Sequence, residues 1–217
     1  MRVALRIWLP DAPGMLGTVA TAIGRTGGNV TGLEVLECQG GVAVDELIVE
    51  LPGPDAVDGM CAGLRSVPGL GIEEVRTLDD GAEEHGTAVL AAAAALVGEF
   101  EHGRIHASLV AAAAELFDAR WVALADPVEG TVLVAHGEPP PMAWLRAFSD
   151  GANFGQVAGA TGASGVLAGL LPRCQLALCL GRPVAFRDRE RREIEMLSTV
   201  ADAWLATTGA LPGARPA

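Results

Sequence analysis

The fold of the first third of the chain is decided by residues 3–16, whose sequence is VALRIWLPDAPGML. An apolar side chain stands at every second position of its first half: Val3, Leu5, Ile7 and Leu9. This period of two predicts a strand with one buried face. Residues 10–14 then interrupt the strand with two prolines and a glycine. Apolar residues recur at helical spacing from Met15 to Ile23, so a helix is predicted that ends before Gly27.

The residues that follow continue this pattern. Strands are predicted over residues 30–38 and 42–51, joined by a hairpin turn at 39–41. A second helix is predicted to begin at Pro54, and a last strand covers 71–78. The order is β-α-β-β-α-β, the split βαβ or ferredoxin-like arrangement, with both helices on one face of an antiparallel sheet.

A polar segment without hydrophobic periodicity, residues 79–87, is predicted to link this domain to a second one over residues 88–210. The second domain is predicted to contain an antiparallel sheet and flanking helices. The stretches with helical spacing are 89–100, 109–117, 142–152 and 187–207, and those with strand character are 121–125, 131–136 and 175–180. The glycine-rich segment 155–165 receives no assignment. The predicted class of the whole chain is α/β, of the α+β type.

Composition excludes several classes of function. The 217 residues carry a formal net charge of −12, and all fifteen basic residues are arginine. An acidic chain lacks the positive field that nucleic-acid binding requires. Without lysine, neither a pyridoxal-phosphate Schiff base nor a P-loop can form.

The sequence also predicts where the protein works. No apolar run approaches the ~18 residues of a membrane span. Arg6, Pro10 and Asp11 interrupt the apolar core that a secretory signal needs, so the expected location is the cytoplasm. In that compartment the four cysteines are expected to be reduced thiols in apolar surroundings.

The turn over residues 10–16 is the first candidate binding site. A helix that begins directly after a strand exposes backbone N–H groups and the positive end of its dipole, and both attract a carboxylate. Gly14 allows a ligand to approach the backbone, and Asp11 can accept a hydrogen bond from an ammonium group. In the alternative interpretation, Asp11 caps the helix and Pro13-Gly14 only form the turn.

Residues 3–78 resemble an ACT domain, the regulatory module of amino-acid metabolism. The resemblance rests on Asp11-x-Pro13-Gly14-x-Leu16 after the first strand and on Gly27-Gly28-Asn29-Val30 before the second. It implies a homodimer whose domains form one eight-stranded sheet, with an amino acid bound between the two chains. The implied ligand-binding residues are Asp11, Ala12, Pro13, Gly14, Met15 and Leu16, together with Asn29 and Val30 of the partner subunit.

The second domain more distantly resembles a GAF domain, a fold that senses small molecules and dimerises. The matching features are Leu180-Gly181-Arg182, Phe186, Arg189-Glu190-Arg191 and a helix through Leu197 and Ala201. The resemblance implies that residues 155–165 would form the lid of any ligand site. The alternative is a domain that only packs and dimerises around an empty core.

Catalytic motifs are not expected. Ser164 lies in Gly-Ala-Ser-Gly, which is not the G-x-S-x-G pattern of a nucleophile elbow. His102 and His106 are four residues apart near Glu99, but Gly103 between them suggests a break in the helix. No catalytic residue, metal or cofactor is therefore predicted. The expected function is a non-catalytic regulatory protein that binds an amino acid, with a GAF-like sensor or a ligand-free dimerising adaptor as the alternatives.

Overall fold

The computed structural model describes residues 1–78, 85–99, 102–153 and 165–208, and the chain divides into two compact units, Met1–Glu84 and His85–Ala217. In this part of the chain there are six helices and two four-stranded antiparallel sheets. The predicted α+β class is therefore confirmed. Each unit is described by itself.

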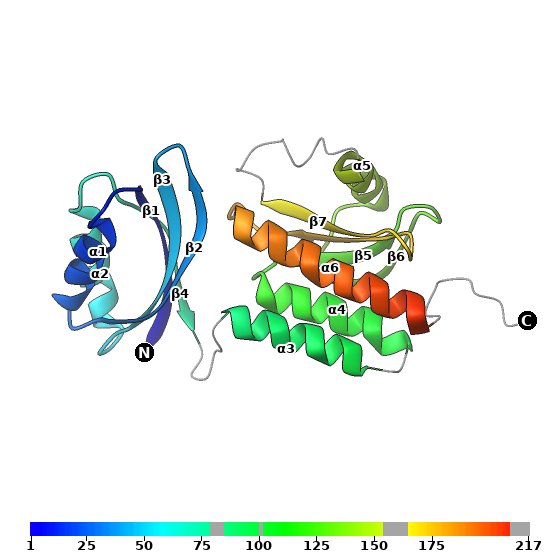
Figure 1. The fold of residues 1–217 in the computed structure, drawn as a ribbon, viewed down its shortest axis with the longest axis horizontal. Helices are drawn as coiled ribbons and strands as arrows, with labels where there is room; N and C mark the ends of the chain where they lie inside the picture. The colour runs from blue at the N-terminus through cyan, green and yellow to red at the C-terminus, as the bar shows by residue number, and fades with distance from the viewer. Residues whose placement is uncertain (79–84, 100–101, 154–164, 209–217) are drawn as a thin grey trace, which may run out of the picture. The chain divides into compact units, whose positions relative to one another are not determined.

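The first unit has the predicted order of elements, β-α-β-β-α-β (Figure 1). The strands form a sheet in the order β2-β3-β1-β4, and every neighbouring pair is antiparallel. The elements are β1 (Arg2–Pro10), α1 (Met15–Gly24), β2 (Asn29–Gln39), β3 (Val42–Glu50), α2 (Asp55–Arg65) and β4 (Gly71–Leu78). Both helices cover one face of this sheet.

The core of the first unit lies between this sheet and its two helices. The alternating apolar side chains of β1 are all buried there, as the period of two predicts. They pack against Val19 and Ile23 of α1 and against Met60 and Leu64 of α2. Burying each such side chain contributes about 1.5–3 kcal/mol, so this interface supplies much of the stability of the unit.

The turn between β2 and β3 fixes the register of the sheet. Gln39 pairs with Val42, so Gly40 and Gly41 alone form the loop. Both have a positive φ, 64° and 80°, as a two-residue turn that matches the twist of its strands requires.

The second unit places three helices on one face of its sheet and one helix on the other (Figure 1). The strand order is β6-β5-β8-β7. The elements are α3 (His85–Gly98), α4 (His102–Leu116), β5 (Trp121–Asp126), β6 (Thr131–His136), α5 (Met142–Asn153), β7 (Val166–Leu171), β8 (Leu176–Gly181) and α6 (Asp188–Thr208).

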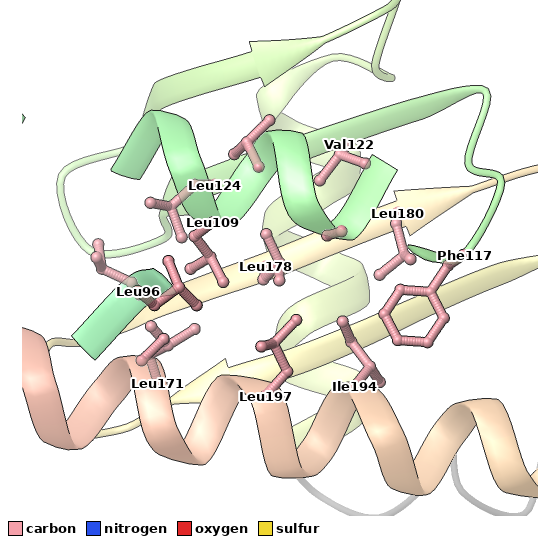
Figure 2. Packing of buried hydrophobic residues seen from close by; sticks show 14 of the residues in the cluster. Leu96, Leu109, Phe117, Val122, Leu124, Leu171, Leu178, Leu180, Ile194 and Leu197 are labelled. Carbon is pink, nitrogen blue, oxygen red and sulfur yellow. The ribbon is translucent and has the colours of Figure 1, made fainter. Parts of the chain in front are cut away.

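The two faces of this second sheet differ in the size of their cores. Helices α3, α4 and α6 enclose the larger core, to which Phe117, Leu178 and Leu197 belong (Figure 2). Helix α5 covers the other face and contacts a much smaller buried cluster around Leu145, Ala177 and Cys179.

Three sequence-based expectations need correction here. Strand β7 was not predicted, because its glycine and alanine weaken the strand pattern that its pairing with β8 imposes. Helix α3 begins at His85, inside the expected linker, because its polar first turn carries no apolar periodicity. Helix α4 begins at His102 and continues through Gly103, which shows that one glycine near a helix terminus is tolerated.

No helix in the described ranges combines the length and the apolar character needed to cross a lipid bilayer.

Candidate functional site

The turn between β1 and α1 leaves backbone donors free. The Met15 N–H donates to the Ala12 carbonyl at 3.2 Å, and the Thr18 N–H donates to the Gly14 carbonyl at 3.1 Å. The N–H groups of Leu16 and Gly17 have no backbone acceptor within the described chain, and no side chain caps this helix. Two free amides at the positive end of a helix form a place where a carboxylate is stabilised.

Gly14 is the N-cap of this helix and has a φ of 89°, a conformation that side-chain-bearing residues rarely adopt. A Cβ added to Gly14 would have no atom within 4 Å. The glycine is therefore required by its backbone angle, and the space above it is open to a ligand.

The Asp11 side chain does not cap α1, so the alternative interpretation of this residue is wrong. Its Oδ2 atom instead accepts a hydrogen bond from the Cys38 thiol on β2, with a sulfur–oxygen distance of 3.0 Å. The Asp11 N–H donates to the Gly41 carbonyl at 2.9 Å, which ties the turn to the β2–β3 hairpin. The hairpin thereby fixes Asp11 at the end of the sheet.

Cys38 corrects the expectation that every cysteine lies in apolar surroundings, because its side chain is exposed. The hydrogen bond to Asp11, followed by desolvation and the negative charges of Asp11 and Asp45, raises the pKa of its thiol. Cys61, Cys174 and Cys179 are buried free thiols, as expected.

Asp45 is a residue of the site that the sequence analysis missed. It pairs with Ile7 on β1 and with Val35 on β2, so its side chain stands on the helix-covered face of the sheet. It is only 2% exposed, and its Oδ1 atom has no hydrogen-bond partner. Burial and, secondarily, the charge of Asp11 raise the pKa of its carboxyl group.

The alternation of apolar residues along β3 could have identified Asp45 from the sequence. Ala43, Leu47 and Val49 are the inward positions of the strand, and Asp45 has the same phase. An acidic residue in phase with an apolar row predicts either a buried ionisable group or a functional group.

Asn29 and Val30 lie at the opposite end of the sheet from this turn. Asn29 pairs with Glu50, whereas the turn adjoins the end where Pro10 pairs with Val42. A single chain therefore brings together residues 11–16 of the implied site and leaves Asn29 and Val30 away from them.

The edge strand β2 presents an apolar surface. Leu33 pairs with Leu47 and Val35 with Asp45, which places both side chains on the helix-covered face of the sheet. They are 44% and 49% exposed, and Leu16 of α1 is also exposed. An edge strand with exposed apolar side chains is a surface on which another strand can add.

A groove of about 370 Å³ runs between α1 and α2 from Gly14 to Arg25. The hydroxyl groups of Thr18 and Thr21 donate to helix carbonyls in this groove, at 3.2 and 2.7 Å. The groove has an exposed floor of small residues and extends the open space above Gly14.

In the second unit, the residues that carry the GAF resemblance perform a structural role. The Arg182 guanidinium binds both carboxylate oxygens of Glu190, at 2.7 and 2.8 Å, and lies 4.2 Å from the centre of the Phe186 ring. Leu197 and Ala201 of α6 are buried in the core. These contacts stabilise the fold of the second unit.

The titratable groups considered for catalysis are dispersed. His106 is half-buried, and burial lowers the pKa of its imidazole. Among the described residues, no group of three histidine, cysteine, aspartate or glutamate side chains is placed to hold a metal ion. Ser164 and most of the proposed lid segment 155–165 lie outside the described residues.

No protein-family model matches the chain, and no curated protein matches it. A crystal structure of an unknown protein from Galdieria sulphuraria aligns with 93% of this chain and 91% of that chain, at 14% sequence identity and a TM-score of 0.31. A likeness at this score carries no argument about fold or activity.

Proposed function

We propose that this chain is a non-catalytic, cytoplasmic regulatory protein that binds an amino acid at a homodimer interface of its first unit. The observation that carries the proposal is the pair of free amides, Leu16 and Gly17, at the end of the same turn that holds the Asp11 carboxylate. An α-amino acid carries one negative and one positive group, and this turn offers a partner for each.

The carboxylate of the ligand binds the two free N–H groups at the start of α1, where the helix dipole adds a favourable term. The ammonium group binds Asp11, which already accepts a hydrogen bond from the Cys38 thiol. Asp45, on β3, adds negative charge to this end of the site. Its charge is one of the causes that raise the pKa of the Cys38 thiol. The two ends of the site thus have opposite electrostatic character.

A second copy of the chain supplies the remaining residues. If two β2 strands pair antiparallel about Glu34, Asn29 of the partner subunit lies opposite Gln39. Gln39 adjoins the hairpin that binds the Asp11 N–H, so this pairing carries Asn29 to the turn. The exposed Leu33 and Val35 become covered in the same step.

Two alternative functions place the ligand elsewhere or require no ligand. The second unit could hold the ligand, in which case changes at Asp11 and Asn29 leave binding intact. The protein could also be an adaptor that dimerises and binds no metabolite.

The first experiment is a thermal-shift screen of the twenty amino acids, in which a true ligand raises the unfolding temperature with concentration. Asp11→Ala and Asn29→Ala should each reduce the shift, whereas the exposed control Asp58→Ala should keep it in full. A shift of undiminished size in both site variants would contradict binding at this turn.

A mixing experiment tests the shared site. Asp11→Ala and Asn29→Ala are denatured together, refolded and assayed, because each mixed dimer then holds one intact site. Return of binding in the mixture supports a site built from two chains. Leu33→Lys should convert the protein to a monomer by gel filtration, and a wild-type mass equal to one chain would refute the interface.

A further inference from the structure

The second unit contains a cavity of about 360 Å³ on the face of its sheet that α5 covers. It lies between α5, the turn from β5 to β6 and the turn from β7 to β8. Its volume falls in the range of sites that bind small molecules. Leu170 and Ala177, which pair across β7 and β8 and face α5, provide an apolar wall.

Helix α5 contributes two residues of opposite charge to the lining of this cavity. Leu145 and Ser149 are the buried positions of the helix, and the Ser149 hydroxyl donates to the Arg146 carbonyl at 3.0 Å. Arg146 and Asp150 each follow a buried position by one residue, and both are exposed residues that line the cavity. They are four residues apart, so their Cβ atoms are separated by about 6 Å.

These two charges do not neutralise each other. In the described part of the chain neither the Arg146 guanidinium nor the Asp150 carboxylate makes an ion pair or a side-chain hydrogen bond. The order arginine then aspartate along a helix is also the less favourable one for such a pair. The cavity therefore presents a cation and an anion side by side, next to an apolar wall.

We propose that this cavity binds a small zwitterion with an apolar body, of the chemical class of the aliphatic α-amino acids. The guanidinium of Arg146 binds the ligand carboxylate, and the carboxylate of Asp150 binds the ligand ammonium. The aliphatic side chain packs against Leu170 and Ala177. A zwitterion contacts both charges at once, whereas a simple anion or a simple cation contacts only one of them.

This site is independent of the one proposed for the first unit, because all its residues belong to the second unit. It also has its own reporter. Trp144 on α5 stacks on Phe148 with ring centres 5.1 Å apart and meets the edge of Trp121 at 6.3 Å. A ligand that contacts α5 changes the surroundings of this tryptophan pair.

The test uses the full chain with Asp11→Ala and Asn29→Ala, so that binding at the first unit does not contribute. The twenty amino acids are titrated individually, with tryptophan fluorescence and calorimetry as readouts. For leucine, the comparison compounds are 4-methylpentanoate, which lacks the ammonium group, and 3-methylbutylamine, which lacks the carboxylate. We expect an aliphatic amino acid to bind and both truncated compounds to bind at least about tenfold more weakly.

Arg146→Gln and Asp150→Asn should each weaken binding about tenfold, because each removes one charge-assisted hydrogen bond. The controls are Arg173→Gln and Glu129→Gln, exposed residues on the neighbouring turns that do not line the cavity. Unchanged affinity in both cavity variants would overturn the proposal, as would the absence of binding by every amino acid. The site at Asp11 is tested separately in the chain that carries Arg146→Gln and Asp150→Asn, in which any remaining thermal shift must depend on Asp11 and Asn29.

Discussion

The Arg182 side chain donates a hydrogen bond from Nη1 to the backbone carbonyl of Phe117 at 2.6 Å and so joins residues 65 positions apart. The same guanidinium binds the Glu190 carboxylate and donates to the carbonyls of Val184 and Ala185. Arg182 therefore connects the end of α4, the end of β8 and the start of α6. Both charged side chains of this pair are about 95% buried, at 6% and 5% exposure.

Arg182→Met should lower the free energy of unfolding by about 3–5 kcal/mol, because the buried Glu190 carboxylate loses the guanidinium that binds both of its oxygens. Equilibrium urea unfolding measures the change. Arg173→Met removes an exposed arginine and should stay within about 0.5 kcal/mol of the wild type. Equal losses in the two variants would show that Arg182 has no special structural role.

Asp45→Asn should change how stability depends on pH. The raised pKa of this carboxyl means that, between the ordinary value of 3.8 and the folded value, the folded chain keeps a proton that the unfolded chain has lost. Stability of the wild type therefore falls as pH rises through that interval. Asp45→Asn removes the ionisable group and with it this pH dependence. The variant should therefore become more stable relative to wild type as pH increases.

The measurement is the free energy of unfolding of both proteins from about pH 4 to about pH 7. Glu50→Gln serves as the control, since Glu50 is an exposed carboxylate on the same strand. Parallel pH profiles for wild type and Asp45→Asn would contradict the assignment of a raised pKa.

Gly14→Ala should destabilise the protein by about 1–2 kcal/mol, because alanine at this left-handed position strains the backbone. No steric clash adds to this cost, since the space around an added Cβ is empty. Gly17→Ala is the matched control on the same helix and should stabilise it by about 0.5–1 kcal/mol. Thermal unfolding of the two variants should therefore shift in opposite directions.

Asp11→Asn should accelerate the alkylation of Cys38 by iodoacetamide at neutral pH. The Asp11 carboxylate holds the pKa of the Cys38 thiol above its ordinary value, and amidation removes the negative charge that opposes thiolate formation. Burial raises the pKa of the Cys174 and Cys179 thiols to about 12, so these should react slowly in both proteins. Mass spectrometry of the labelled chain gives the rates, and an unchanged rate at Cys38 would refute the electrostatic role of Asp11.

Asp202→Ala should destabilise the second unit, because the buried Asp202 carboxylate accepts the N–H groups of Arg173 and Cys174 at 3.2 and 3.0 Å. Each donor left without a partner costs about 1–3 kcal/mol. Asp202→Asn keeps one acceptor oxygen and should lose less. Chemical unfolding that ranks Asn at or below Ala would contradict this account of the β7–β8 turn.

Local periodicity was enough to predict most elements of the first unit. The alternation of β1, the hairpin at Gly40-Gly41 and the helical spacing from Met15 are all signals that lie within a few residues of one another. The second unit was less predictable, because β7 carries a weak local pattern and becomes a strand only through its pairing with β8. The same limit applied to the site. The turn at residues 10–16 was visible in the sequence, whereas Asp45 and its proximity to Cys38 depend on strand register.

The amino-acid sequence by itself determined which faces of the strands and helices are apolar, where the turns fall and where α1 begins. Those properties follow from the chemistry of neighbouring residues and from the fixed periods of strand and helix. Only the tertiary structure decided that Arg182 meets Phe117, that Trp204 donates to the carbonyl of Glu99 across 105 residues and that Arg146 and Asp150 line one cavity. Such contacts arise because packing brings distant segments together, and no local pattern encodes which buried group becomes the partner of another.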